Sequence, residues 1–167
     1  TTFTFDGESN CTTIGSYVFH TCVALSSINI PAGVTTIGEY AYHGCTNLAN
    51  VIFADESVLT SIPNAMFNNC SSLTSITIPA SVTTIGTSVC EGCTKLATIT
   101  FDNVNALTSV GTNLFLAAPS IRTVYYKVYS SELSTVAIEI TNQINTVSDP
   151  DPTYIYIYTS NGITYTT

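Results

Sequence analysis

The sequence predicts an α/β solenoid, a short superhelix of about five stacked rungs whose residue counts alternate between 23 and 25. One column of apolar residues, made of Ile14, Ile37, Ile62, Ile85 and Val110, advances along the chain in steps of 23, 25, 23 and 25. Two more columns advance by the same steps: Leu25, Leu48, Leu73, Leu96 and Ile121, and Ile28, Val51, Ile76, Ile99 and Val124. One rung of this size cannot bury its apolar face alone, so stacked neighbours are expected to share one core.

Each rung is expected to contribute one strand just after its Leu column. Alternation along the first of these strands places Ile28 and Ile30 inward and Ser27 and Asn29 outward. A second extended piece, such as "VTTI", and a short helical turn around "EYAYHGC" or "NAMFNNC" complete the predicted coil. The predicted strands are 27–30, 50–53, 75–78, 98–101 and 123–126.

The loops that lead into the rungs are of two kinds. Short rungs begin with "IPAGV" or "IPASV", and long rungs begin with the partly acidic "FDGESNC", "FADESVL" or "FDNVNAL". The repeating unit is therefore a pair of rungs, one short and one long, with a sequence period of 48. The acidic residues of the long loops could hold calcium, but a solvated acidic edge is the favoured interpretation. They are Asp6, Glu8, Asp55, Glu56 and Asp102.

This register resembles leucine-rich repeats. The segments 25–30 and 73–78 match the L-x-x-L-x-L strand core, and the consensus "IPxxVTTIGxxAFxGCxxLxxI" resembles the BspA-type (Treponema-type) repeat over about residues 1–126. That repeat type is known from surface proteins of bacteria, of some parasitic protists and of large DNA viruses, so the resemblance implies a binding or adhesion scaffold. Three departures are Pro63 in the Gly column, Cys90 in the aromatic column and Ala118 in the Cys column. The last two indicate a smaller core side chain and a fading pattern.

Composition excludes several partners. Only 8% of the residues are charged and the net charge is −8, with Lys95, Arg122 and Lys127 as the only basic residues. We therefore expect no nucleic-acid partner, and no run of about 20 apolar residues predicts membrane insertion. Ser, Thr and Asn in place of Lys and Glu are typical of extracellular, cell-surface or virion-surface proteins. No catalytic motif is present, so we expect neither enzymatic activity nor a cofactor.

The six cysteines all map to core columns of the repeat, where a free thiol behaves as a small apolar group. Side chains of one column point in parallel from successive rungs, which is poor geometry for disulfides. Free thiols are therefore expected, although disulfides remain an alternative for a chain of this composition. A metal or redox site at the Cys-x-x-Cys pair is disfavoured. The core cysteines are Cys11, Cys22, Cys45, Cys70, Cys90 and Cys93.

Two further columns invite a functional interpretation. His20 and His43 could form a metal site, but zinc requires four ligands around one point, and a solvent-exposed pair is favoured. The Thr column could form an ice-binding array, but adjacent threonines lack the Thr-x-Thr spacing that puts both hydroxyls on one face. Backbone preference and hydrogen bonding along the stack explain the column as well. It contains Thr12, Thr35, Thr60, Thr83 and Thr108.

The outward strand positions form the open face that commonly binds partners in leucine-rich repeats, and we expect it to bind a protein or a glycan. It is uncharged, and its large apolar groups are Ile52 and Tyr125. Asn10 and Asn69 begin glycosylation sequons, whose use stays open. The predicted face consists of Ser27, Asn29, Asn50, Ile52, Ser75, Thr77, Thr98, Thr100, Thr123 and Tyr125.

We expect the repeat region at 1–126, a capping helix within 127–148, and a linker with a β-hairpin at 149–167 that is a cap, a pairing element or the start of a further domain. The helix is predicted from Leu133, Val136, Ala137, Ile140 and Ile144 at helical spacing. The hairpin is expected over 154–159 and 163–166, turning at 160–162.

Both ends of the chain are predicted assembly surfaces. Phe3 and Phe5 precede the first strand by one rung length, so we expect the last strand of an earlier, truncated repeat there. The aromatic, uncharged hairpin could pair with another chain. A structural subunit of a filament, fibre or virion surface, built from copies of the chain, is therefore the alternative to adhesion. The expected contacts are Phe3, Phe5, Tyr154, Tyr156 and Tyr158.

Overall fold

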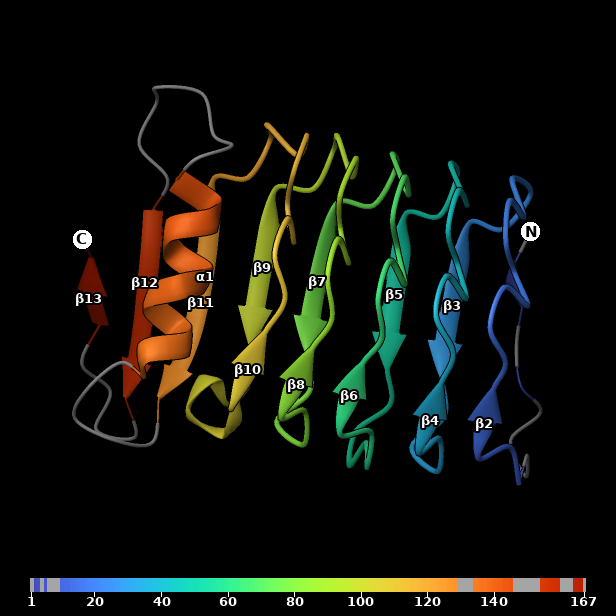
Figure 1. The fold of residues 1–167 in the computed structure, drawn as a ribbon, viewed down its shortest axis with the longest axis horizontal. Helices are drawn as coiled ribbons and strands as arrows, with labels where there is room; N and C mark the ends of the chain where they lie inside the picture. Colours follow the sequence, from blue (N-terminus) through green and yellow to red (C-terminus); the bar gives the residue numbers. More distant parts are fainter. Residues whose placement is uncertain are drawn as a thin grey trace.

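The computed structural model is a β-solenoid of about five turns with one C-terminal helix (Figure 1). It describes residues 2–3, 5, 10–128, 134–145, 154–159 and 164–166. The solenoid of the sequence-based prediction is confirmed, whereas its α/β class is corrected to β.

Each rung contains a short strand and a longer strand. The longer strands are β3 (Ser27–Ile30), β5 (Asn50–Phe53), β7 (Ser75–Ile78), β9 (Thr98–Phe101) and β11 (Thr123–Val128), preceded by β1 (Thr2–Phe3). The short strands are β2 (Thr13–Ile14), β4 (Thr36–Ile37), β6 (Ser61–Ile62), β8 (Thr84–Ile85) and β10 (Ser109–Val110). We number the rungs 1 to 5 by these strand pairs, from β2 and β3 to β10 and β11.

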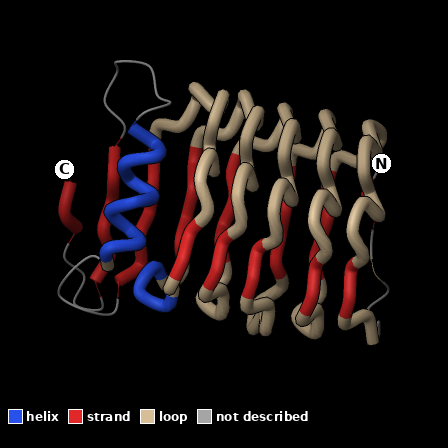
Figure 2. The backbone as a smooth tube through the Cα atoms, viewed as in Figure 1, coloured by secondary structure: helices blue, strands red, loops and turns tan. Residues whose placement is uncertain are grey.

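The strands of neighbouring rungs pair in parallel, with Ser27 opposite Asn50 and Thr98 opposite Thr123 as examples. A turn edge joins the two strands within a rung, and a loop edge joins one rung to the next (Figure 2). Inward side chains of all rungs form one apolar core in which Leu48, Leu73 and Leu96 are fully buried. The predicted columns are therefore core columns.

The turn edge of rungs 1 to 5, all of it described, contains no helix, which corrects the expected helical turns. Left-handed backbone angles recur along it, for example at Tyr40 with φ 58° and Gly44 with φ 71°. Such residues interrupt a right-handed helical path. The amides instead bond to the next rung, as in the bond from Tyr42 N to Met66 O at 3.0 Å. Between residues 10 and 128 the one helical segment is the 3₁₀ turn η1 (Val104–Ala106).

After rung 5 the coil continues with different elements. α1 (Thr135–Asn145) contacts β10 and η1, and it takes the place of a sixth short strand (Figure 1). Ser134 Oγ accepts a hydrogen bond from Ala137 N at the start of α1. The expected apolar stripe packs inward, with Ala137, Ile140 and Ile144 buried and Val136 half-buried, while Leu133 lies outside the described residues.

β12 (Tyr154–Thr159) continues the long-strand sheet rather than forming a separate hairpin. It pairs in parallel with β11 and in antiparallel fashion with β13 (Thr164–Thr166). The expected antiparallel pair is present, and β13 is the edge strand of the sheet. That this hairpin pairs with another chain stays a prediction. The domain boundaries at 126 and 148 stay predictions.

Candidate binding surface

The outward strand face is most exposed over rungs 1 to 3. Ile52 is 59% exposed, and its neighbours Asn29, Asn50, Ser75 and Thr77 are exposed too. Strand alternation explains this exposure, because β5 and β7 turn Val51, Ile76 and Ile78 toward the core. The remaining predicted face residues are half-buried: Ser27, Thr98, Thr100, Thr123 and Tyr125.

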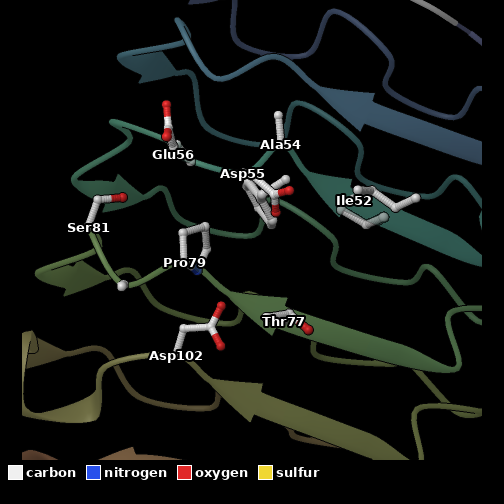
Figure 3. A pocket seen from close by; sticks show the side chains of 12 residues that line it. Ile52, Ala54, Asp55, Glu56, Thr77, Pro79, Ser81 and Asp102 are labelled. Atoms are coloured by element: carbon white, nitrogen blue, oxygen red, sulfur yellow. The ribbon is translucent and has the colours of Figure 1, made fainter. Parts of the chain in front are cut away.

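A hollow of about 410 Å³ adjoins this face at the loop edge. It lies where the short loop 79–81 sits beside the longer loop 54–57, and Ile52 and Thr77 of the face line it (Figure 3). The alternation of short and long loops therefore produces a depression beside the exposed strand face. The sequence contained the signal for it, in the two loop types, but only the structure shows the hollow.

Acidic groups line the hollow. Asp55, Glu56 and Asp102 contribute carboxylates, and Asp102 forms an ion pair with Lys127. Among the described residues, no group of three His, Cys, Asp or Glu side chains is arranged to hold a metal ion. Asp6 and Glu8, the other acidic residues of the predicted edge, lie outside the described part of the chain.

The cysteines are free thiols, and all of them except Cys11, which precedes β2, lie along the turn edge. Three of the thiols donate to carbonyls of the preceding rung: Cys45 to Phe19 O at 3.0 Å, Cys70 to Tyr42 O at 3.2 Å and Cys93 to Phe67 O at 3.2 Å. Burial raises the pKa of Cys45 to about 11 and raises that of Cys70 further. For Cys90, a hydrogen bond with Cys93 and then burial raise the pKa. Cys11 and Cys22 are half-buried, and the other four are buried.

Thiols that stay protonated react slowly, so the buried members of this column have a packing role.

Four rings cluster on the turn edge of rungs 1 and 2. His20 and His43 stack with ring centroids 4.9 Å apart, and Tyr17 stacks on Tyr40 at 5.0 Å. Burial, and then the charge of His20, lower the pKa of His43. Parallel stacked imidazoles point their nitrogen atoms alongside one another rather than at one common point.

The sequence predicted only part of this cluster. The expected solvent exposure is present at His20, whereas His43 is half-buried beneath it. The two tyrosines were overlooked, although Tyr17 and Tyr40 recur one rung apart as the histidines do.

The Thr column lies at the loop edge, and several of its hydroxyls are engaged. Thr35 Oγ1 donates to Thr12 O at 3.2 Å, and Thr83 Oγ1 and Thr108 Oγ1 each donate to the preceding Thr carbonyl at 3.1 Å. The ladder uses the donor capacity that an ice-binding array would present to water.

The predicted assembly residues lie at opposite ends of the solenoid. Phe3 is 40% exposed and contacts Phe19 at a centroid distance of 4.9 Å, while Phe5 is half-buried. Tyr154 and Tyr156 pair through their backbones with Thr123 and Tyr125. Tyr158 pairs in the same way with Lys127. The side chains of these three β12 tyrosines lie outside the described part of the chain.

The two sequon asparagines occupy different settings. Asn10 and Asn69 are both exposed. Asn69 has φ 60°, and its N–H donates to Glu91 O at 2.7 Å in the turn edge. The use of both sequons stays open.

The family model described as "BspA type Leucine rich repeat region" matches the chain in six copies over residues 12–145. No curated protein matches the sequence. Among the described residues, no helix has the length and apolar character that a membrane crossing requires.

Solved structures of bacterial proteins are similar to the chain. The leucine-rich repeat protein of T. pallidum has a TM-score of 0.64 and 22% identity, over 87% of this chain and 81% of that one. A leucine-rich cell surface protein from Faecalibacterium prausnitzii has a TM-score of 0.64 and 26% identity, over 84% of this chain and 33% of that one. A leucine-rich repeat protein from Eubacterium ventriosum has a TM-score of 0.57 and 24% identity, over 74% of this chain and 37% of that one.

Proposed function

Because the chain belongs to the BspA-type leucine-rich repeat family, we propose that it is a non-enzymatic scaffold that binds a protein or glycan partner in adhesion. The binding surface in this proposal is the outward face of the long strands, centred on β5 and β7. The partner is not a nucleic acid, and no part of the chain inserts into a membrane.

The exposure of Ile52 carries the proposal. A large apolar side chain that is 59% exposed, surrounded by the amides and hydroxyls of Asn29, Asn50, Ser75 and Thr77, has the composition of an interface centre with a polar rim. The adjoining hollow of about 410 Å³ adds concave surface beside it.

We further propose an extracellular, cell-surface or virion-surface location. The F. prausnitzii relative is named as a cell surface protein, and it is 26% identical to this chain. A surface whose solubility rests on hydroxyls and amides supports the same location.

We also propose that successive rungs alternate in length between 23 and 25 residues. Thr84 pairs with Ser61 of the preceding rung, a sequence separation of 23. Thr108 Oγ1 bonds to Thr83 O across the next boundary, a separation of 25. Both separations agree with the steps of the apolar columns.

A binding screen tests the function. We would present the chain to arrays of glycans and of purified cell-surface proteins, and then measure any partner by surface plasmon resonance. Ile52→Lys places a charge at the centre of the face and should weaken binding at least about tenfold, as expected for a buried interface residue. The matched control is Thr36→Lys, which adds the same charge on the short-strand side. Equal loss in both variants, or no loss in either, would reject the strand face as the binding surface.

A structural subunit of a filament, fibre or virion surface is the second candidate. Val18 favours it, because this residue is 53% exposed although its column mates Ala41, Met66, Val89 and Leu114 are buried. A copy of the chain stacked on rung 1 would bury Val18. Light scattering over a concentration series checks this candidate, and a constant molecular mass at every concentration would count against it.

A further inference from the structure

The boundary between rungs 2 and 3, which we call the seam, interrupts the hydrogen-bonded ladders of the solenoid on both sides. β5 and β7 belong to different sheets, and so do β4 and β6, although residues 10–128 are all described. At the other boundaries among rungs 1 to 5, both the long and the short strands pair. Rungs 2 and 3 are therefore joined by fewer hydrogen bonds than their neighbours.

Pro63 explains why one of these hydrogen bonds is missing. Its column otherwise holds glycines whose N–H groups donate to the preceding rung at 2.8 Å: Gly38 to Ile14 O, Gly86 to Ile62 O and Gly111 to Ile85 O. Proline has no N–H, so no equivalent bond reaches Ile37 O across the seam.

Pro63 also prevents close approach. A Cβ atom added at Gly38 would lie 2.2 Å from Ser16 N, and one added at Gly86 would lie 2.6 Å from Asn64 N. The column therefore tolerates no Cβ where two rungs are fully paired. Pro63 carries one, so it is incompatible with the close approach that the glycine positions make.

The Thr ladder breaks at the same boundary. Thr35, Thr83 and Thr108 each donate both N–H and Oγ1 to the preceding Thr carbonyl, with N to O distances between 2.8 and 2.9 Å. Thr60, within the described residues, donates neither group to Thr35.

The long-strand side is weakened as well. Ala54 and Asp102 donate from the residue after their strand to the preceding rung at 2.9 and 3.0 Å, but the equivalent residue of rung 3 is Pro79. The bond from Thr74 N to Ala49 O is 3.5 Å long, against 2.9 Å for Ala97 N to Thr74 O.

The turn edge holds the seam together. Tyr40, Tyr42 and Gly44 donate their N–H groups to the carbonyls of rung 3 at 3.1, 3.0 and 2.8 Å. Cys70 Sγ donates to Tyr42 O at 3.2 Å along the same edge. The seam is thus bonded at one edge and open at the other, which is the arrangement of a hinge.

We propose that the seam is a hinge about which rungs 1–2 and rungs 3–5 move as two bodies, with the turn edge as its axis. The hollow lies at the opposite, loop edge, between segment 54–57, which directly follows β5 of rung 2, and segment 79–81, which directly follows β7 of rung 3 (Figure 3). Hinge motion therefore changes the width of the hollow and the curvature of the adjoining strand face. Ile52 on β5 and Thr77 on β7 move relative to each other.

Pairs of spin labels test the hinge. Cysteines that replace Thr36 and Ser61 report on the seam, and cysteines that replace Thr84 and Ser109 report on the boundary between rungs 4 and 5. Both pairs lie on short strands and have the same separation along the chain. A third pair, at Thr46 and Ser71, reports on the turn edge. Cys11 and Cys22, which are half-buried, are replaced by serine in every protein.

Continuous-wave electron paramagnetic resonance measures the distribution of distances in each pair. We expect the Thr36/Ser61 distribution to be about twice as wide as that of Thr84/Ser109, and that of Thr46/Ser71 to be narrow, because the motion opens the loop edge. Equal widths at the seam and at the rung 4–5 boundary would overturn the hinge, and so would a turn-edge pair as broad as the seam pair.

Substitutions that restore the missing backbone N–H donors provide the second test. Pro63→Gly returns the donor and removes the Cβ, so it should narrow the Thr36/Ser61 distribution and leave Thr84/Ser109 unchanged. Pro79→Ala restores the donor on the other side, and Pro31→Ala is its matched control because it has the same loop position one rung pair earlier. A seam pair that stays equally broad in Pro63→Gly and Pro79→Ala would contradict the assignment. If neither variant folds, the comparison of label pairs in the unmodified repeat still decides.

Discussion

Some core residues depart from ideal packing or hydrogen bonding, and this lowers the free energy of unfolding by a measurable amount. Tyr42 stacks between Phe19 and Phe67, at centroid distances of 5.1 and 5.6 Å, and its buried hydroxyl has no hydrogen-bond partner. An unpaired buried hydroxyl costs about 1–3 kcal/mol. We therefore expect Tyr42→Phe to raise the free energy of unfolding by about 1 kcal/mol, measured by chemical denaturation.

Tyr126→Phe is the matched control, because Tyr126 is also buried but its hydroxyl lies 3.1 Å from Thr141 Oγ1. This variant should lose stability. A decrease for Tyr42→Phe as well would mean that its hydroxyl is hydrogen-bonded in solution.

We expect Cys90 and Phe101 to compensate for each other in size. Cys90 occupies the aromatic column, and it lines a cavity of only about 10 Å³ together with Phe101 and Phe115. A ring does not fit such a space, so Cys90→Phe should destabilise the chain by about 1–3 kcal/mol through overpacking.

The double variant Cys90→Phe/Phe101→Ile should recover most of that loss, since Phe67 and Ile78 form the same combination in rung 3. Denaturation of the two single variants and the double variant gives the coupling energy. Strictly additive losses would contradict compensation.

At the scale of elements, the sequence predicted the strands well because apolar columns determine strand register directly. The columns that begin with Ile14 and Ile28 fall on the short and long strands. The expected helical turns of the turn edge were wrong, because left-handed angles at non-glycine residues such as Tyr40 leave no clear sequence signal. The strand face followed from alternation, whereas the hollow depends on two loops of different length meeting in space.

The seam was visible in the sequence as Pro63 in a glycine column. The effect of Pro63 on rung pairing was not visible in the sequence. The column holds glycines because Gly38 closely approaches Ser16, and Gly86 closely approaches Asn64, in neighbouring rungs. Only the structure shows that approach.

α1 is attached to rung 5 through the side chain of Gln143. Its Nε2 donates to Gly111 O at 2.8 Å, and its Oε1 accepts from Leu114 N at 3.0 Å. The side-chain amide thus bonds backbone groups of the last turn edge. Gln143→Ala should lower the free energy of unfolding by about 2 kcal/mol, since two backbone groups lose a partner.

Gln143→Glu separates the two bonds, because a carboxylate keeps the acceptor for Leu114 N but loses the donor to Gly111 O. We expect it to destabilise the chain as well, through loss of that donor. Asn142→Ala, at an exposed neighbouring position of α1, is the control and should change little. Equal stabilities of Gln143→Ala and Asn142→Ala would show that α1 does not depend on these bonds.

For the whole molecule, the shared core couples stability to pH at two limits. On the acid side, burial and then the charge of His20 lower the pKa of His43 from its ordinary value of 6.5. The unfolded chain therefore binds a proton at higher pH than the native chain does. This contribution to stability is complete above the unfolded value and is lost as the pH falls below it. In thermal unfolding followed by circular dichroism, the midpoint temperature should fall as the pH is lowered from about 7 to about 5. His43→Asn should make this fall shallower.

On the alkaline side the sign is reversed, because the native core holds protons that the unfolded chain releases. Burial raises the pKa of Cys45 from 9.0 to about 11, and it also raises those of Cys70 and Tyr42. The stabilisation is complete below the unfolded thiol value of 9.0 and is lost as the pH rises toward 11. The midpoint of thermal unfolding should fall by several degrees across that interval. Cys45→Ala should make the fall shallower, while Glu39→Gln on the exposed turn edge should leave it unchanged. If the midpoint stays level between these two pH values, the thiols are open to solvent in the native state. That result would contradict a packed thiol column shared by successive rungs.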